Sequence, residues 1–304
     1  MPILTNSRRR STRPQTSFSG FIPLRVYSAI QPERSPCCMA AASNLSDSYE
    51  VSAKYYDQAY AAKPDLVDLP FYLNMARQSG GPVLELACGT GRVLLPTARA
   101  GIEIHGVENS APMLHQLTAN LEHEPLEVRK RICVFAGDMR TFRGKSKYRL
   151  VTIPFRPMQH MHTLEDQISA LRTAAHHLDE DGVLAFDVFY PRYDLLTSGL
   201  GEEIFELEWH AGADPATVVR RYLRRDSVDK IRQNFTGTFF YRTFQSDKLL
   251  KEESEPLKLT YYTYPQLRAL FLLAGLQPVA EYGSFARAPL DNDAQEMIFV
   301  LKKA

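Results

Sequence analysis

The chain has little cysteine, no long hydrophobic run and no large excess of either charge. Its 304 residues include four cysteines, Cys37, Cys38, Cys88 and Cys133. They show no C-x-x-C spacing and no histidine at a ligand spacing, so we expect no metal site, no disulfide framework and a reducing compartment. No apolar stretch approaches the roughly 18 residues of a membrane-spanning helix. We therefore expect a soluble protein with no membrane partner.

Charge is distributed unevenly along the chain, although the net charge is only +1. Residues 1–43 carry six arginines and one glutamate, a net charge of +5, which leaves −4 on residues 44–304 by subtraction. A mildly acidic body lacks the basic surface that nucleic-acid-binding proteins present. We therefore expect no nucleic-acid partner.

The first 32 residues are rich in arginine and serine and contain no acidic residue. This composition is typical of an organelle transit peptide, which would direct the protein to a mitochondrion or chloroplast. The alternative is an untargeted tail on a cytoplasmic protein, with Met39 as another start. In both cases residues 1–43 are interpreted as a disordered or targeting leader and residues 44–304 as the folded domain.

The most informative segment is residues 83–108. The apolar run VLELA at 83–87 predicts a buried parallel strand, and CGTG at 88–91 predicts a tight turn into a helix. A second apolar strand, over 102–107, ends in the carboxylate of Glu108. Gly89 and Gly91 let the backbone bend and approach a ligand, and a carboxylate at the next strand end can accept hydrogen bonds from both ribose hydroxyls. The unit therefore predicts a nucleoside-binding βαβ half.

Two common phosphate-binding motifs are absent from this unit. A dinucleotide site needs G-x-G-x-x-G or a closing alanine, and the third position here is Leu94. The loop G-x-x-x-x-G-K-[ST] does not occur. A nicotinamide-dependent Rossmann oxidoreductase is therefore a disfavoured alternative. The second alternative is that these residues form only a tight strand–helix turn in some other α/β protein.

The remaining loop, E-x-A-C-G-x-G, resembles motif I of the class I S-adenosylmethionine-dependent methyltransferases. The usual form is Asp/Glu-x-Gly-x-Gly-x-Gly, so Ala87 replaces the first glycine. The resemblance continues in NSAPML at 109–114 and GDM at 137–139, spans roughly residues 49–303, and is of the small-molecule type. It implies S-adenosyl-L-methionine as the cofactor and a small-molecule methyl acceptor as the partner.

The resemblance also implies a set of cofactor-binding residues. In the family, the acidic residue at the third strand end, here Asp138, hydrogen-bonds the adenine amine. The segment YEVSAKYYDQAY at 49–60 matches a helix that covers the cofactor, where a tyrosine face can stabilise a sulfonium; ordinary helix packing is the alternative for each tyrosine. The expected cofactor-binding residues are Tyr56, Glu85, Ala87, Cys88, Gly89, Gly91, Glu108, Asn109, Asp138 and Met139.

The rest of the chain alternates predicted strands and helices. Strands are expected over 132–138, over 148–153 and, after a turn at Asp181–Gly182, over 183–188. Helices are expected over 164–178 and 267–274, with a closing antiparallel pair after the second. Ser110 is a predicted helix N-cap. The fold class is α/β: a Rossmann-like mixed seven-stranded sheet with helices on both faces and ligands at the carboxyl ends of the strands.

An insertion at about 199–262 interrupts this pattern. Period-two alternation predicts antiparallel strands over 204–209, 218–223, 231–242 and 257–263, with a turn at 226–229. We interpret the insertion as a small antiparallel β lid over the strand ends. A dimer surface is the alternative.

The acceptor side is expected at the end of the fourth strand, in the segment FRPMQH at 155–160. A methyltransferase must orient its acceptor and remove a proton from it, and His160 is the predicted general base because its ordinary pKa is near neutrality. Arg156 and Gln159 complete the predicted catalytic set as a polar floor, with Trp209 or Tyr241 as an apolar roof. The alternative for His160 is a capping or packing role, and Asp187 is equally well structural or catalytic.

The predicted function is transfer of a methyl group from S-adenosylmethionine to a nitrogen or oxygen atom of a small molecule. A catalytically inactive nucleoside-binding subunit, whose inserted sheet binds a partner, is the non-enzymatic alternative. We expect a monomer or a homodimer.

Overall fold

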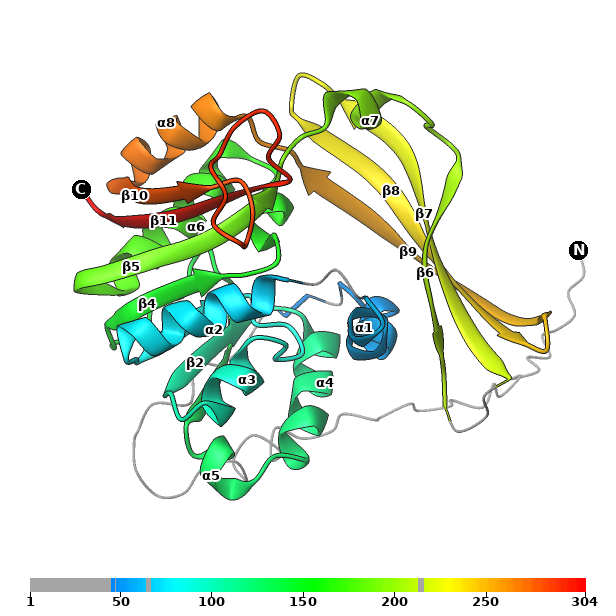
Figure 1. The fold of residues 1–304 in the computed structure, drawn as a ribbon, viewed down its shortest axis with the longest axis horizontal. Coiled ribbons are helices and arrows are strands. Elements are labelled where there is room, and N and C mark those ends of the chain that lie inside the picture. The colour runs from blue at the N-terminus through cyan, green and yellow to red at the C-terminus, as the bar shows by residue number, and fades with distance from the viewer. Residues whose placement is uncertain (1–44, 47, 64–66, 213–215) are drawn as a thin grey trace, which may run out of the picture. The chain divides into compact units, whose positions relative to one another are not determined.

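The computed structural model describes residues 45–304, apart from residue 47 and residues 64–66 and 213–215. The predicted leader at 1–43 lies outside the described residues. Within this range the chain forms one large mixed sheet with helices on both faces and a second, smaller sheet (Figure 1).

The large sheet has seven strands in the order β10-β11-β5-β4-β1-β2-β3. In chain order they are β1 (Val83–Leu86), β2 (Ile104–Glu108), β3 (Ile132–Ala136), β4 (Tyr148–Ile153), β5 (Leu178–Phe189), β10 (Leu276–Tyr282) and β11 (Glu296–Lys303). The first five are parallel, whereas β11 runs antiparallel to β5 and β10 antiparallel to β11. The predicted fold class is confirmed, and the carboxyl ends of β1 to β5 share one edge.

Alternate residues of each central strand enter different cores, as the side-chain period of a strand requires. Val83 and Leu150 pack with Tyr72 on one face, whereas Leu84 and Val151 pack with the opposite helices on the other. The helices of the first face are α2 (Asp68–Ser79), α3 (Leu94–Arg99), α4 (Ala111–Glu122) and α5 (Leu126–Arg129), and those of the second are α6 (Leu164–His177) and α8 (Tyr264–Ala274).

Local chemistry explains two boundaries. The Ser110 hydroxyl accepts a hydrogen bond from the Met113 N–H (3.3 Å), so the predicted N-cap of α4 is confirmed. The predicted turn at Asp181–Gly182 is wrong, because β5 already pairs with β4 at Leu178, with an irregular register that accommodates the extra residues. A Cβ on Gly182 would lie 2.6 Å from the carbonyl oxygen of Tyr148, so glycine permits this close pairing.

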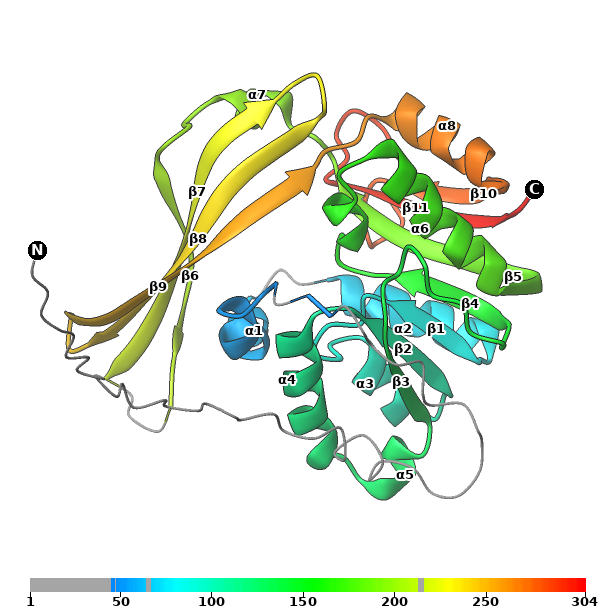
Figure 2. The same cartoon turned by 180° about the vertical axis from the view of Figure 1, so that it is seen from behind.

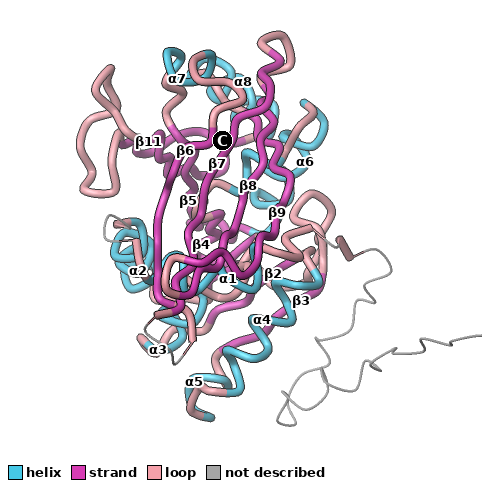
Figure 3. The backbone as a smooth tube through the Cα atoms, turned by 90° about the vertical axis from the view of Figure 1, so that its right-hand side faces the viewer, coloured by secondary structure: helices cyan, strands magenta, loops and turns pink. Residues whose placement is uncertain are grey.

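The insertion folds as a separate antiparallel sheet in the order β6-β7-β8-β9 (Figure 3). Its strands are β6 (Glu203–His210), β7 (Thr217–Asp229), β8 (Asn234–Gln245) and β9 (Lys248–Thr260), preceded by α7 (Tyr193–Thr197). The predicted turn at 226–229 is wrong: β7 continues to Asp229, whose Oδ1 accepts hydrogen bonds from the N–H groups of Ile231 and Arg232 and so forms the turn.

Helix α1 (Ser52–Ala61) lies between the second sheet and the end of α4, as the opposite views of Figures 1 and 2 both show. It contacts β6 on one side and α4 on the other. This helix therefore connects the two sheets at the edge where the parallel strands end.

Candidate active site

The turn after β1 passes through the left-handed region of the backbone at three residues. The φ angles are 59° at Ala87, 56° at Gly89 and 91° at Gly91. A Cβ on Gly91 would lie 2.6 Å from Cδ1 of Leu117, so α4 packs directly against the backbone there. No atom lies within 4 Å of a Cβ placed on Gly89. Gly91 is therefore required for packing, while Gly89 borders open space that can receive a ligand.

Glu108 ends β2 beside this turn and is 8% exposed. Its Oε2 accepts a hydrogen bond from the Gly89 N–H (2.8 Å), and its Oε1 accepts from the N–H groups of Asn109 (2.9 Å) and Ser110 (2.8 Å). Burial raises the pKa of the Glu108 carboxyl, and these backbone donors oppose the rise. A carboxylate retains further lone pairs, so Glu108 can still accept bonds from ribose hydroxyls.

Glu85 is a buried carboxyl group with one unpaired oxygen. It lies in β1, is 2% exposed, and its Oε2 has no hydrogen-bond partner. Burial raises the pKa of Glu85 to about 8, with Arg92 opposing the rise. An unpaired buried carboxylate is costly, so this position is complementary to a cation.

Asp57 fastens α1 to the turn after β1. Its Oδ1 accepts from the Thr90 hydroxyl (2.6 Å), and its Oδ2 accepts from the Asn120 side-chain amide (2.7 Å). The same amide of Asn120 donates to the carbonyl oxygen of Thr90 (3.1 Å). Thr90 stands between the two glycines, so Asp57 couples the position of α1 to the shape of the turn.

The N-terminal end of α1 is held by the second sheet. The carboxylate of Glu255 in β9 accepts from the N–H groups of Val51 (3.0 Å) and Ser52 (3.2 Å), where a helix N-terminus favours negative charge. Glu253 accepts from the Tyr55 hydroxyl (2.6 Å) and pairs with Lys54 (3.1 Å). Helix α1 is thus bonded to the turn after β1 on one side and to β9 on the other.

The predicted acceptor segment forms a tight turn and a 3₁₀ helix, η2 (Pro157–His160). Phe155 and Arg156, which precede it, have φ angles of 67° and 72°. The Arg92 guanidinium lies 4.4 Å from the centre of the Phe155 ring, and the Tyr60 ring packs edge-on against that ring at 4.8 Å. The segment therefore lies against residues of α1 and of the turn after β1.

His160 is hydrogen-bonded to Tyr49, with 2.6 Å between Nε2 and the hydroxyl oxygen. Burial and the neighbouring His162 lower the pKa of His160 to about 4, and burial raises the pKa of Tyr49 well above its usual value. Both groups are therefore neutral at pH 7. Tyr56, Glu108 and Tyr60 also add to the rise in the Tyr49 pKa.

The other predicted acceptor-side residues have structural partners. Gln159 is fully buried, donates to the carbonyl oxygen of Thr260 (3.1 Å) and accepts from the Phe189 N–H (3.3 Å). The Arg156 guanidinium forms an ion pair with Glu296. Trp209 and Tyr241, the predicted roof, are buried against α1. These contacts fasten η2 and α1 in place.

The remaining predicted cofactor residues lie at the strand ends or beside them. The Tyr56 ring lies 4.5 Å from that of Tyr60. Cys88 and Met139 are buried, and burial raises the pKa of the Cys88 thiol. The carbonyl oxygen of Asn109 accepts from the Ser46 N–H (2.9 Å). Asp138 pairs with Arg140, whose second partner is Asp166 (2.7 Å).

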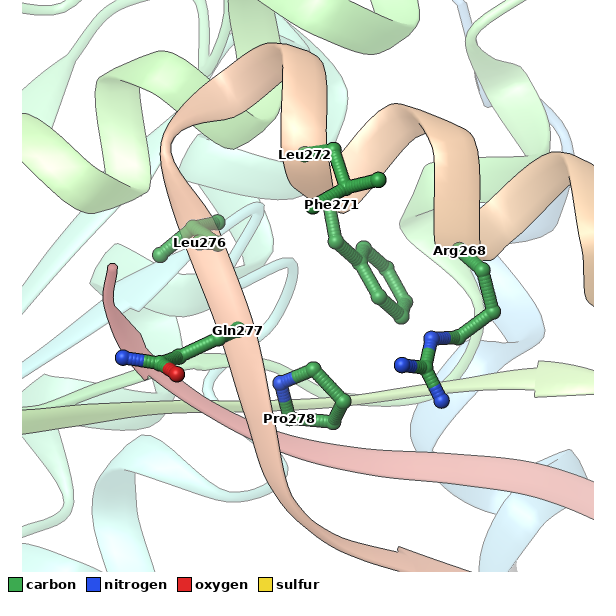
Figure 4. Close-up of a pocket in the computed structure, with 6 residues that line it drawn as sticks. All are labelled: Arg268, Phe271, Leu272, Leu276, Gln277 and Pro278. Carbon is green, nitrogen blue, oxygen red and sulfur yellow. The ribbon is translucent and has the colours of Figure 1, made fainter.

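A surface pocket lies elsewhere, between α8 and β10 (Figure 4). It is lined by Arg268, Phe271, Leu272, Leu276, Gln277 and Pro278. None of these residues belongs to the turn after β1 or to η2, so this pocket is separate from the strand ends. Among the described residues, no group of three or more His, Cys, Asp or Glu side chains could hold a metal ion. No helix in that part of the chain is long and apolar enough to cross a membrane.

Comparison with known proteins identifies this arrangement. A methyltransferase-domain family matches residues 83–182, from β1 into β5. The chain is a class I methyltransferase that depends on S-adenosylmethionine. It is similar to the cypemycin N-terminal methyltransferase of a Streptomyces species, at 25% identity over 74% of this chain and 84% of that protein.

A further relative and a solved structure are also similar to this chain. The dTDP-3-amino-3,6-dideoxy-alpha-D-glucopyranose N,N-dimethyltransferase of Streptomyces fradiae is 24% identical over 74% of this chain and 83% of its own length. The CcbJ methyltransferase structure from Streptomyces caelestis shares the fold with a TM-score of 0.67, at 23% identity, covering 87% of this chain and 99% of that one. The nicotinamide alternative is not supported.

The residues at the strand ends fit the cofactor. S-adenosylmethionine carries an ammonium and a sulfonium, and the unpaired Glu85 Oε2 offers a negative partner. Glu108 offers acceptors for ribose hydroxyls, and the open side of Gly89 allows close approach. When bound, the cofactor supplies an activated methyl group.

Sequence reasoning missed Asp57 and did not rank Tyr49. Both residues lie in the segment 49–60. The adjacent Tyr56 and Asp57 were the signal that the sequence offered for this part of the site. Their partners Thr90, Asn120 and His160 are 33 to 111 residues away in sequence, so no local pattern could pair them.

Proposed function

We propose that this methyltransferase methylates the nitrogen of an amino group on a small molecule of the amino-sugar or peptide type. The observation that carries the proposal is a second unpaired carboxylate oxygen, Glu296 Oε2. Glu296 pairs through its other oxygen with Arg156, the residue immediately before η2. An amine must react in its neutral form, because an ammonium has no lone pair, and the nitrogen becomes positively charged as it receives the methyl group. A nearby unpaired carboxylate oxygen would stabilise that developing charge and the methylammonium product, so this side favours an amine over a hydroxyl.

The names of two relatives support a nitrogen acceptor. The cypemycin enzyme is named for N-terminal methylation, and the Streptomyces fradiae enzyme for N,N-dimethylation of an amino sugar. Fold alone would not choose between nitrogen and oxygen, because the same fold supports many chemistries.

Tyr49 and His160 would orient the acceptor. In the tautomer whose Nε2–H donates to the Tyr49 hydroxyl oxygen, Nδ1 of His160 would be the acceptor for the N–H of the substrate amine. Tyr49 would then hold the ring while helix α1 excludes water. The lowered pKa of His160 keeps the ring unprotonated, and so available as an acceptor, at pH values well above about 4. Gln159 and Arg156 would support η2. We further infer that residues 44–304 form the methyltransferase domain and that the second sheet covers the acceptor.

The test is a matched panel of acceptors with S-adenosylmethionine labelled on the methyl group. We would use a 3-amino sugar nucleotide against its 3-hydroxy analogue, and a peptide with a free α-amine against the same peptide acetylated. Label in the amine member of at least one pair supports the proposal. Label confined to the hydroxyl sugar, with both amines inert, contradicts it.

A further inference from the structure

The backbone of the acceptor loop is strained at two adjacent residues. Phe155 and Arg156 both have φ near 70°, and neither is glycine. Residues with a Cβ rarely adopt this conformation, and it persists only where the surrounding structure imposes it. Some contact must therefore hold the loop in place.

Asp187 makes that contact. This β5 residue is 1% exposed, and its Oδ1 accepts a hydrogen bond from the Phe155 N–H (2.8 Å). The same oxygen accepts a short hydrogen bond from the hydroxyl of Tyr72, on α2. Burial raises the pKa of Asp187 to about 7, and the hydrogen bonds from Tyr72 and Phe155 oppose the rise because they stabilise the ionised form. The contact thus ties the loop to a central strand and a packed helix.

The position of this loop determines the position of His160. Arg156 is the residue before η2, and its carbonyl oxygen accepts from the Gln159 N–H (3.0 Å). The next residue is His160, whose ring meets the Tyr49 hydroxyl. A change of φ at Phe155 or Arg156 would rotate the whole 3₁₀ turn and carry the imidazole away from Tyr49.

We propose that Asp187 is a positioning residue for methyl transfer, which with Tyr72 holds Phe155 and Arg156 in the left-handed conformation that sets His160 against Tyr49. The inference rests on the proposed function only for the contact between His160 and the acceptor. The placement of His160 can be tested without any acceptor, so failure of one proposal is distinguishable from failure of the other.

The test compares Asp187→Ala with Asp187→Asn and with a control in the same strand, Val188→Ala. Val188 is fully buried in the core and its apolar side chain makes no hydrogen bond to Phe155, so its truncation lowers stability and leaves the Asp187–Phe155 bond in place. The readouts are amide hydrogen exchange over residues 155–160, NMR titration of the His160 ring, and the melting temperature.

Asp187→Ala should speed local exchange by about 10-fold or more and raise the His160 pKa from about 4 toward its ordinary value. Asp187→Asn should restore both toward the unsubstituted protein, because its side-chain oxygen still accepts from Phe155. Val188→Ala should lower the melting temperature and leave the His160 titration unchanged.

The proposal is overturned if Asp187→Ala lowers only the melting temperature, as the control does. If Asp187→Ala does not fold, Tyr72→Phe provides the same test, since it removes the hydroxyl donor and keeps the ring. It should raise the His160 pKa in the same direction by a smaller amount, and an unchanged titration contradicts the proposal.

Discussion

The proposed cofactor side and the proposed acceptor side of this methyltransferase are built in different ways. The cofactor side is local: Glu85, Gly89 and Glu108 lie within one βαβ unit, and Glu108 bonds directly to Gly89. The acceptor side is assembled from distant segments, with Tyr49 and His160 separated by 111 residues. A local site can be recognised from a short motif, whereas an assembled site requires the fold.

Helix α1 is where the two sides meet. Asp57 bonds to the turn after β1, while Glu255 and Glu253 of β9 hold the other end of the helix. A disturbance of α1 should therefore affect both sides, whereas a disturbance of the turn or of η2 should affect one.

The largest expected effect separates the two glycines of the cofactor turn. Gly91→Ala places a Cβ 2.6 Å from Leu117 at a φ of 91°, so we expect a loss of about 2–4 kcal/mol of folding stability from strain and overpacking. Gly89→Ala meets no atom within 4 Å, so it should cost about 1 kcal/mol in stability and weaken cofactor binding instead. Denaturant unfolding and calorimetry measure both quantities. Equal stability losses in the two variants would contradict this assignment.

The second effect concerns the connection through α1. Asp57→Ala removes the acceptor of the Thr90 and Asn120 bonds, so α1 should detach from the turn and S-adenosylmethionine affinity should fall by about 10-fold, or about 1.4 kcal/mol. Lys54→Ala, which removes an exposed ion pair of the same helix, should change affinity by less than about twofold. Calorimetric titration distinguishes them. Equal affinities in both variants would show that α1 does not depend on Asp57.

The third effect is a proton exchange at Glu85. With its pKa raised to about 8, this carboxyl is mostly protonated at pH 7, and a bound ammonium should ionise it. Binding should release up to about one proton, measured by calorimetry in buffers of different ionisation enthalpy. Glu85→Gln should abolish the release.

The raised pKa of Glu85 also predicts how folding stability depends on pH. Because its folded pKa is raised above the unfolded value, Glu85 destabilises the protein progressively as the pH rises from about 4.5 to about 8, and costs nothing below that window. Glu85→Gln should flatten the stability of the cofactor-free protein across this range. An unchanged pH dependence in urea unfolding would show that Glu85 is already ionised.

The smallest effect concerns Ala87, where the motif departs from the usual glycine. Ala87→Gly removes the strain of a positive φ, which stabilises the folded state by about 1 kcal/mol. The glycine also gives the unfolded chain more conformational entropy, which destabilises the protein by nearly as much, so the net stability should rise by no more than about 0.5 kcal/mol. Cofactor affinity should not change. A loss of stability in denaturant unfolding would mean that the Ala87 methyl group contributes more packing than its strain costs.

Features that depend on neighbouring residues could be predicted from the sequence, whereas features assembled from distant segments could not. The fold class, the Ser110 cap and the strand ending in Glu108 could be predicted because each depends on neighbouring residues. The turn at 226–229 could not be placed, because polar residues there equally suit the exposed face of a strand, and β7 continues through them to Asp229. The first half of β9 has two adjacent leucines followed by Lys251, Glu252 and Glu253, which gives no apolar period, so it could not be recognised.

Sequence also could not separate chemical from structural roles on the acceptor side. Gln159 was a reasonable polar contact for an acceptor until the fold showed its amide bonded to Thr260 and Phe189. The sequence could place Asp187 at the end of a strand. It could not predict the contact with the strained Phe155, because the two residues belong to different strand–helix units and lie 32 residues apart.

The most direct test of the division between the two sides is a paired measurement on Glu108→Ala and His160→Ala. Calorimetry would give the affinity for S-adenosylmethionine, and single-turnover assays with the best amine of the panel would give the methyl-transfer rate. Glu108→Ala should weaken affinity by about 1–3 kcal/mol, whereas His160→Ala should keep the affinity and slow transfer by about 100-fold or more. If His160→Ala loses the cofactor and Glu108→Ala keeps it, the assignment of the two sides is wrong.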